Sequence, residues 1–174
     1  MFFMRIGVLL LGVWLVGCSQ VYETTLDNGL KIVVKEDHRS PVVVSQIWYK
    51  VGASTEPEGQ SGISHVLEHM MFKGTKTHKP GEFSRIIAEN GGRENAFTGR
   101  DYTAYFQQLE KSRLAVSFEL EADRMHNLLL QEEEVRKEVQ VVMEERRTRT
   151  DDEPVAQLYE KFMATAFQVH PYKD

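Results

Sequence analysis

The sequence lacks several features that would point to common protein classes. Cys18 is its single cysteine, so no intramolecular disulfide can form, and any metal site must use His, Asp or Glu side chains. Positive charge is not in excess, because the net charge is −5, and nothing in this balance indicates nucleic acid as a partner. Internal repeats and low-complexity stretches are absent, and 41% hydrophobic with 27% charged residues is ordinary for a globular protein.

A long hydrophobic run is also missing at the N-terminus, where the apolar stretch 6–16 is too short to span a bilayer comfortably. Arg5 precedes this stretch and Gly17-Cys18 ends it, which resembles the signal of bacterial lipoproteins, whose Cys is acylated. We therefore expect 1–17 to be a signal peptide and Cys18 to carry a lipid anchor. An ordinary cleaved signal and an uncleaved anchor helix are the alternatives. Ser19, rather than Asp, favours the outer membrane, so we expect a place in the bacterial cell envelope, facing the periplasm if the cell is Gram-negative.

Strand signals prevail in the first part of the chain and helix signals follow them. Asp27-Asn28-Gly29 is a strong hairpin turn signal, and Gly99-Arg100-Asp101 separates two further strands rich in aromatic residues. This order predicts an α+β fold with a largely antiparallel sheet and helices packed on one side. The expected strands are 21–26, 30–34, 42–51 and a pair within 95–109; the expected helices are 61–72, 80–90, 111–130, 132–150 and 154–168. Ser61 or Ser64 is expected to cap the first helix, and Phe83 and Phe118 to lie in the core.

The helix expected at 61–72 carries two histidines and a carboxylate. His65 and His69 are four residues apart, so they share one helix face and can point at one metal ion. Glu68 lies on nearly the same face, close enough to reach a water molecule beside that ion. The alternative is a chance pair of histidines on an amphipathic helix, which binds nothing. A third ligand would decide between the two.

The charged helix expected after residue 131 offers many candidates for this third ligand. Glu138 and Glu145 are seven residues apart and therefore lie on one face of that helix. Glu134 and Glu144 are further candidates, and all four carboxylates also fit a solvated surface. Spacing alone does not choose among them.

A family resemblance does choose. The segment from His65 to His69, followed by Met-Met-Phe-Lys-Gly-Thr, resembles the active-site helix of the M16 metallopeptidases, the family of pitrilysin, insulin-degrading enzyme and the mitochondrial processing peptidase. The resemblance implies one Zn²⁺ per chain on His65, His69 and Glu145. Glu68 is then the catalytic base, and Glu138 supports the site from outside the ligand set.

A second segment, Gly91-Gly92-Arg93-Glu94-Asn95-Ala96-Phe97-Thr98, resembles the family strand beside the metal. By this resemblance Asn95 and Ala96 contact the substrate, an extended peptide that adds to the edge of the sheet. Without the resemblance, Asn95 fits equally well as a turn residue that follows the two glycines.

The function implied is that of a zinc-dependent endopeptidase acting on extended peptides or small unfolded proteins. Glu68 would accept a proton from the attacking water and pass it to the leaving amine. M16 enzymes combine several related domains, so 18–174 would be an N-terminal domain incomplete at its C-terminal end, and a second M16-type half or subunit is an expected partner. One alternative is a lipid-anchored, non-catalytic zinc-binding or assembly subunit, against which the intact Glu68 argues. Another is a structural lipoprotein domain with an accidental histidine pair.

Overall fold

The computed structural model describes residues 20–173. The predictions for the signal peptide at 1–17 and for Cys18 therefore lie outside the described residues. The chain divides into two compact units, one ending at Ser40 and the other starting at Pro41. Among the helices described, none is both long and apolar enough to cross a membrane.

The first unit contains the predicted hairpin. Strand β1 (Val21–Thr25) pairs antiparallel with β2 (Lys31–Lys35). Gly29 adopts φ 87°, and the Asn28 side chain accepts a hydrogen bond from the backbone N–H of Leu30 at 3.0 Å. The turn therefore uses the residues that the sequence marked for it, because Gly tolerates positive φ and Asn closes a local turn.

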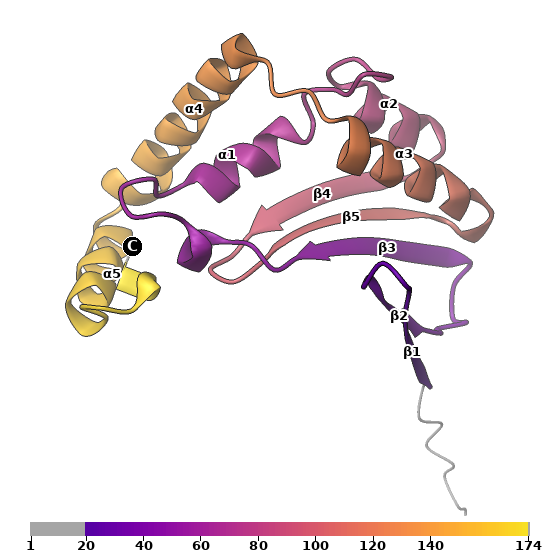
Figure 1. The fold of residues 1–174 in the computed structure, drawn as a ribbon, viewed down its shortest axis with the longest axis horizontal. Helices are drawn as coiled ribbons and strands as arrows, with labels where there is room; N and C mark the ends of the chain where they lie inside the picture. The colour runs from indigo at the N-terminus through magenta and orange to yellow at the C-terminus, as the bar shows by residue number, and fades with distance from the viewer. Residues whose placement is uncertain (1–19, 174) are drawn as a thin grey trace, which may run out of the picture. The chain divides into compact units, whose positions relative to one another are not determined.

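The second unit is built on a three-stranded sheet. Strands β3 (Val42–Tyr49), β4 (Arg93–Thr98) and β5 (Thr103–Glu110) are arranged in the order β3-β5-β4, and both pairings are antiparallel. The mixed helix and sheet architecture with antiparallel pairing is confirmed. Helices α1 (Ile63–Met70), α2 (Glu82–Glu89) and α3 (Leu114–Asn127) all cover the same face of this sheet (Figure 1).

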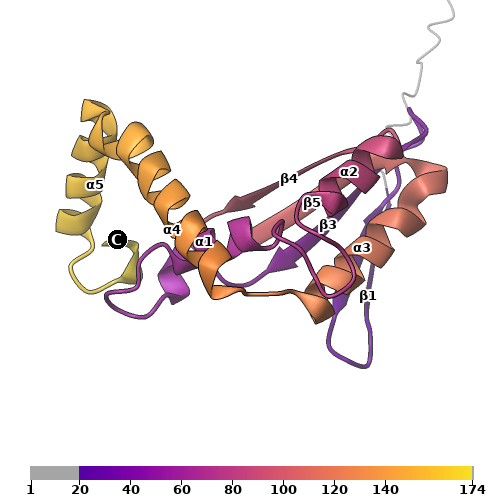
Figure 2. The same cartoon turned by 90° about the horizontal axis from the view of Figure 1, so that it is seen from above.

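The remaining helices continue from α3 toward the C-terminus. Helix α4 (Glu132–Arg146) packs against α1, ends in a π-helical turn (Arg147–Asp151) and leads into α5 (Pro154–Ala166) (Figure 2). Pro154 begins α5, where its missing N–H costs no helical hydrogen bond. Three short 3₁₀ turns complete the fold: Ala53–Thr55, Lys111–Arg113 and Pro171–Lys173.

The hydrophobic core lies between α2, α3 and β5, and its buried members are Phe83, Ile87, Leu109 and Leu120. Phe83 was correctly expected there, but the expectation for Phe118 was wrong, since Phe118 is 57% exposed. Its neighbour two positions along, Leu120, points to the opposite side of α3 and is buried. The buried side of α3 also carries polar residues, so the spacing of apolar residues in the sequence does not identify the face that packs in the core.

Candidate metal centre

Helix α1 is held at its N-terminus by a carboxylate from the preceding loop. Gly62 occupies the N-cap position at φ 94°, so neither Ser61 nor Ser64 caps the helix, and that prediction was wrong. Glu56 instead accepts hydrogen bonds from the backbone N–H groups of Gly62 at 2.8 Å and Ser64 at 2.7 Å. A carboxylate at this end also compensates the positive end of the helix dipole. The first turn of α1, which carries His65, is thereby fixed.

The structure brings three of the predicted residues together. One ligand atom from each of His65, His69 and Glu145 lies within 4.8 Å of the other two. His65 Nε2 is 3.6 Å from Glu145 Oε2, and His69 Nε2 is 3.9 Å from Glu145 Oε1. The histidines come from successive turns of α1 and the carboxylate from the end of α4, so the packing of these two helices builds the cluster.

Glu138 lies behind His69. Its Oε2 is 3.0 Å from His69 Nδ1, and its Oε1 is 2.6 Å from the ammonium group of Lys73. Burial raises the pKa of Glu138, but hydrogen bonds from Lys73 and His69 outweigh it and hold this pKa below its ordinary range. An ionised Glu138 accepts the Nδ1–H proton of His69, which leaves the Nε2 lone pair pointing toward Glu145 as a metal ligand requires.

The donor set fits a zinc ion. Two imidazole nitrogens and one carboxylate are a common ligand set of catalytic zinc, and tetrahedral ligands at ~2.1 Å from an ion lie ~3.4 Å apart, close to the two distances above. Within residues 20–173, the buried Glu145 Oε2 receives no hydrogen bond, although the guanidinium of Arg149 lies 3.3 Å away. A buried carboxylate oxygen without a donor is costly unless a cation binds it.

Glu68 lies beside this cluster and is oriented by the sheet. The hydroxyl of Thr98, at the end of β4, donates a hydrogen bond to Glu68 Oε2. Thr103, the β5 partner of Thr98, donates in turn to the backbone carbonyl of Val51 at 2.9 Å. One oxygen of Glu68 is therefore occupied by Thr98, while the cleft shared by Glu68, the two histidines and Glu145 lies open to solvent.

Asn95 and Ala96 lie on β4 and line the same cleft, which has a volume of about 740 Å³. Strand β4 pairs only with β5 among the described strands, so its other edge is available to an extended peptide. Asn95 is paired with Phe106 inside the strand, so the turn interpretation of Asn95 was wrong.

Comparison with known proteins decides the family. The family model described as Insulinase (Peptidase family M16) matches residues 31–174. The chain belongs to peptidase family M16. Its resemblance to the M16 metallopeptidases is thus confirmed.

Relatives within family M16 include several zinc proteases. The zinc protease PqqE of Helicobacter pylori is 46% identical over 149 residues, which are 85% of this chain and 34% of that protein. The probable mitochondrial-processing peptidase subunit beta of Arabidopsis thaliana is 30% identical over 151 residues, 85% of this chain and 28% of that protein. A crystal structure of a protease from Helicobacter pylori matches with a TM-score of 0.86 and 44% identity, covering 89% of this chain and 38% of that one. The chain thus spans about a third of the length of these M16 relatives.

Four residues that contact or border the candidate site were not found from the sequence: Glu56, Lys73, Thr98 and Arg149. Lys73 and Thr98 lie within the two segments that resemble the family, so their position next to the motif residues was the available signal. Glu56 and Arg149 reach the site from a loop and from a π-helical turn. No periodic pattern marks such positions.

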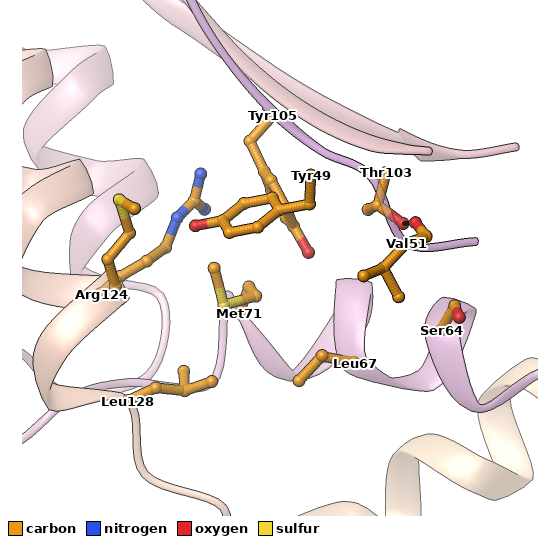
Figure 3. A pocket seen from close by; sticks show the side chains of 10 residues that line it. Tyr49, Val51, Ser64, Leu67, Met71, Thr103, Tyr105, Arg124 and Leu128 are labelled. Carbon is orange, nitrogen blue, oxygen red and sulfur yellow. Dashed lines mark hydrogen bonds between the residues drawn. The ribbon is translucent and has the colours of Figure 1, made fainter. Parts of the chain in front are cut away.

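The other face of α1 borders an apolar pocket of about 210 Å³ (Figure 3). Leu67 of α1 and Met71, which follows that helix, line it on one side, and Tyr49 and Tyr105 line it from the sheet. Burial raises the pKa of both tyrosines, so both stay neutral phenols at physiological pH. The candidate ligands His65 and His69 do not line this pocket, which borders the more apolar face of α1.

Proposed function

We propose that this chain carries the metal centre of a zinc-dependent endopeptidase that hydrolyses extended peptides or small unfolded proteins. The M16 relatives, named as zinc proteases, indicate a metallopeptidase. The observation that carries the proposal is the convergence of His65, His69 and Glu145, with the buried Glu145 Oε2 left without a hydrogen-bond donor in the described part of the chain. These three residues would hold one Zn²⁺ per chain.

When bound, the zinc ion would act as a Lewis acid toward the peptide carbonyl and the attacking water. Glu68 is the general base in this proposal: Thr98 holds its Oε2, and the other oxygen takes the proton of the attacking water. The same carboxyl then passes the proton to the leaving amine. Glu138 and Lys73 keep His69 in the tautomer that ligates through Nε2.

Substrate binding is assigned to the free edge of β4. An extended peptide can hydrogen-bond to the backbone at Asn95 and Ala96, which requires no particular side chain of the substrate. Thr98, on the same strand, binds Glu68, so a peptide on this edge runs past the proposed base.

The partner and the location belong to the proposal too. Because the M16 relatives are about three times as long as the matched segment, we expect activity to require a second M16-type half or subunit. A lipid anchor at Cys18 would place the chain in the bacterial cell envelope, on the periplasmic side of the outer membrane in a Gram-negative cell. The apolar stretch 6–16 and Cys18 support this part.

Zinc content per chain, measured for wild type, Glu145→Gln and Glu68→Gln, tests the assignment. We expect about one zinc in wild type and in Glu68→Gln, and much less in Glu145→Gln, because Glu145 is a proposed ligand and Glu68 is not. Peptide cleavage, measured with and without an added M16-type half, should occur in wild type and be lost in Glu68→Gln. Zinc binding by wild type without cleavage in either case would favour the non-catalytic assembly subunit, and no zinc in folded wild type would contradict the metal centre.

A further inference from the structure

Two arginines line the cleft that contains the proposed zinc ligands. Arg100 lies two residues after the end of β4, and Arg149 lies in the π-helical turn after α4. The guanidinium of Arg149 is 3.3 Å from the Glu145 carboxylate, so positive charge borders the proposed third ligand.

The carboxylates of the same cleft are already engaged. Glu56 accepts two backbone hydrogen bonds at the start of α1, and Glu68 accepts one from Thr98. Glu145 is the proposed third ligand, so its charge would be shared with the zinc ion. No carboxylate that lines the cleft remains for the two arginines once zinc is bound.

Arg100 is a half-buried cation that forms no ion pair with a described residue. Over the described range 20–173, no carboxylate lies within ion-pair distance of Arg100, and its buried Nε donates no hydrogen bond. Its guanidinium lies against the rings of Tyr172, at 5.3 Å, and Tyr159, at 5.9 Å. The rings orient the group, and its buried Nε has no acceptor among the described residues, so the guanidinium can accommodate an anion.

Arg149 has one anionic neighbour, the Glu145 carboxylate at 3.3 Å, and its side chain is 72% exposed. That contact makes no aligned hydrogen bond, since Glu145 Oε2 has no donor. A guanidinium carries five N–H donors in a planar fork, so most of those of Arg149 stay available to a ligand in the cleft.

We propose that Arg100 and Arg149 form a carboxylate-binding subsite, so that the enzyme prefers peptides with an Asp or Glu side chain near the cleaved bond. This inference rests on the proposed peptidase function and names its substrate class. Thr98 marks the position of the base along β4, and Arg100 lies two residues further on. Because a strand rises ~3.3 Å per residue, the acidic side chain is expected within about two residues of the bond that is cut.

The test uses the zinc-loaded chain together with an added M16-type half, and two internally quenched peptide libraries. Both are degenerate in sequence, but one has Asp fixed at a single position and the other has Asn there. The ratio of kcat/KM for the two libraries is measured in wild type, in Arg100→Gln/Arg149→Gln, and in the matched control Arg136→Gln. Arg136 lies on α4, pairs with Glu132 and does not line the cleft. Binding of both libraries to Glu68→Gln, followed by fluorescence anisotropy, gives the same comparison without cleavage.

We expect wild type and Arg136→Gln to prefer the Asp library by roughly tenfold at one fixed position, and the double variant to lose the preference. The wild-type preference should also shrink as salt rises from about 0.05 to about 0.5 M, a result that needs no variant to fold. Cleavage of both libraries at equal rates would overturn the subsite and leave the peptidase function intact. Preferential binding of the Asp library without cleavage would support the subsite and contradict the peptidase function, and the absence of both cleavage and preference would overturn the two together.

Discussion

The buried polar network behind β5 and the cluster at the metal centre use similar residues in opposite ways. In the network, Glu121 and Arg124 are almost fully buried, and both oxygens of Glu121 are occupied. Its Oε1 accepts from Gln107 at 2.5 Å and also from Arg124, and its Oε2 accepts from Arg124 Nε at 3.0 Å. At the metal centre, Glu145 keeps an oxygen that receives no hydrogen bond from any described residue.

This difference between Glu121 and Glu145 indicates a structural role for Glu121 and a binding role for Glu145. The Arg124 guanidinium lies against the rings of Tyr105, Phe83 and Phe72 at 4.3, 4.5 and 5.2 Å and borders the apolar pocket of Figure 3, where its buried Nη1 has no hydrogen-bond partner among the described residues. A buried carboxylate whose oxygens are filled by protein donors stabilises one fold, whereas a carboxylate with an unfilled oxygen beside two imidazoles has a place for a cation. We infer a cation site from the unfilled oxygen of Glu145 together with the two imidazoles beside it, and a structural role from Glu121, whose oxygens are filled.

The largest effect is expected from breaking the buried ion pair between Glu121 and Arg124. Arg124→Leu leaves Glu121 as an uncompensated buried charge, and we expect the free energy of unfolding to fall by about 3–5 kcal/mol. Denaturant unfolding of the purified chain measures this loss. The double variant Arg124→Leu/Glu121→Gln removes the charge as well and should recover most of the stability. If the double variant were as unstable as the single one, packing of Arg124 against the rings, rather than its charge, would be the stabilising part.

The next effect sharpens the contrast at Glu145. Without zinc, Glu145→Gln should change stability by less than about 0.5 kcal/mol, because removing the charge at the unfilled Oε2 is offset by losing its 3.3 Å contact with Arg149. With zinc at about 1,000 times its dissociation constant, wild type should gain about 4 kcal/mol that Glu145→Gln does not gain. Thermal unfolding with zinc and with a chelator gives both numbers. A large loss in the variant under chelator would show that Glu145 is structural in the way that Glu121 is.

A smaller effect is expected behind His69. Lys73→Met removes the cation that contacts Glu138 at 2.6 Å, and we expect zinc affinity to fall by about 10–100-fold. Lys73→Arg should restore most of this affinity, since it keeps a cationic donor. Competition with a chromogenic chelator measures both variants at one pH. Equal affinity in Lys73→Met and wild type would mean that Glu138 orients His69 without help from Lys73.

Much of the fold could be predicted from the sequence, because local signals determine it. The hairpin turn at Asn28 and Gly29, the strand pair around Gly99 to Asp101 and the order of the helices follow from backbone preferences and periodicity. The boundaries differ by a few residues; for example, the helix expected from 111 starts as a 3₁₀ turn and becomes α-helical at Leu114.

Features that depend on tertiary contacts could not be predicted in this way. The face of α3 toward the sheet carries Glu121 and Arg124, whose burial depends on their mutual pairing, and Phe118 is therefore on the exposed side. Similarly, spacing left four glutamates open as the third ligand, and only the family resemblance chose Glu145, which the packing of α4 on α1 brings beside the histidines.

The smallest effect concerns Glu94, a half-buried residue whose carboxylate oxygens are buried and have at most a weak contact with Ser84. Burial raises the pKa of Glu94, so the folded state holds its proton more tightly than the unfolded state, and stability falls as pH rises above the ordinary value of about 4.3. Glu94→Gln removes this loss, and we expect it to stabilise the chain by about 1 kcal/mol at pH 7 and hardly at all near pH 4. The exposed Glu89→Gln serves as the control and should change little at either pH. A gain from Glu94→Gln that stayed constant with pH would arise from packing, whereas a loss at pH 7 would mean that Glu94 resembles Glu121 and binds a cation or donor in the folded state.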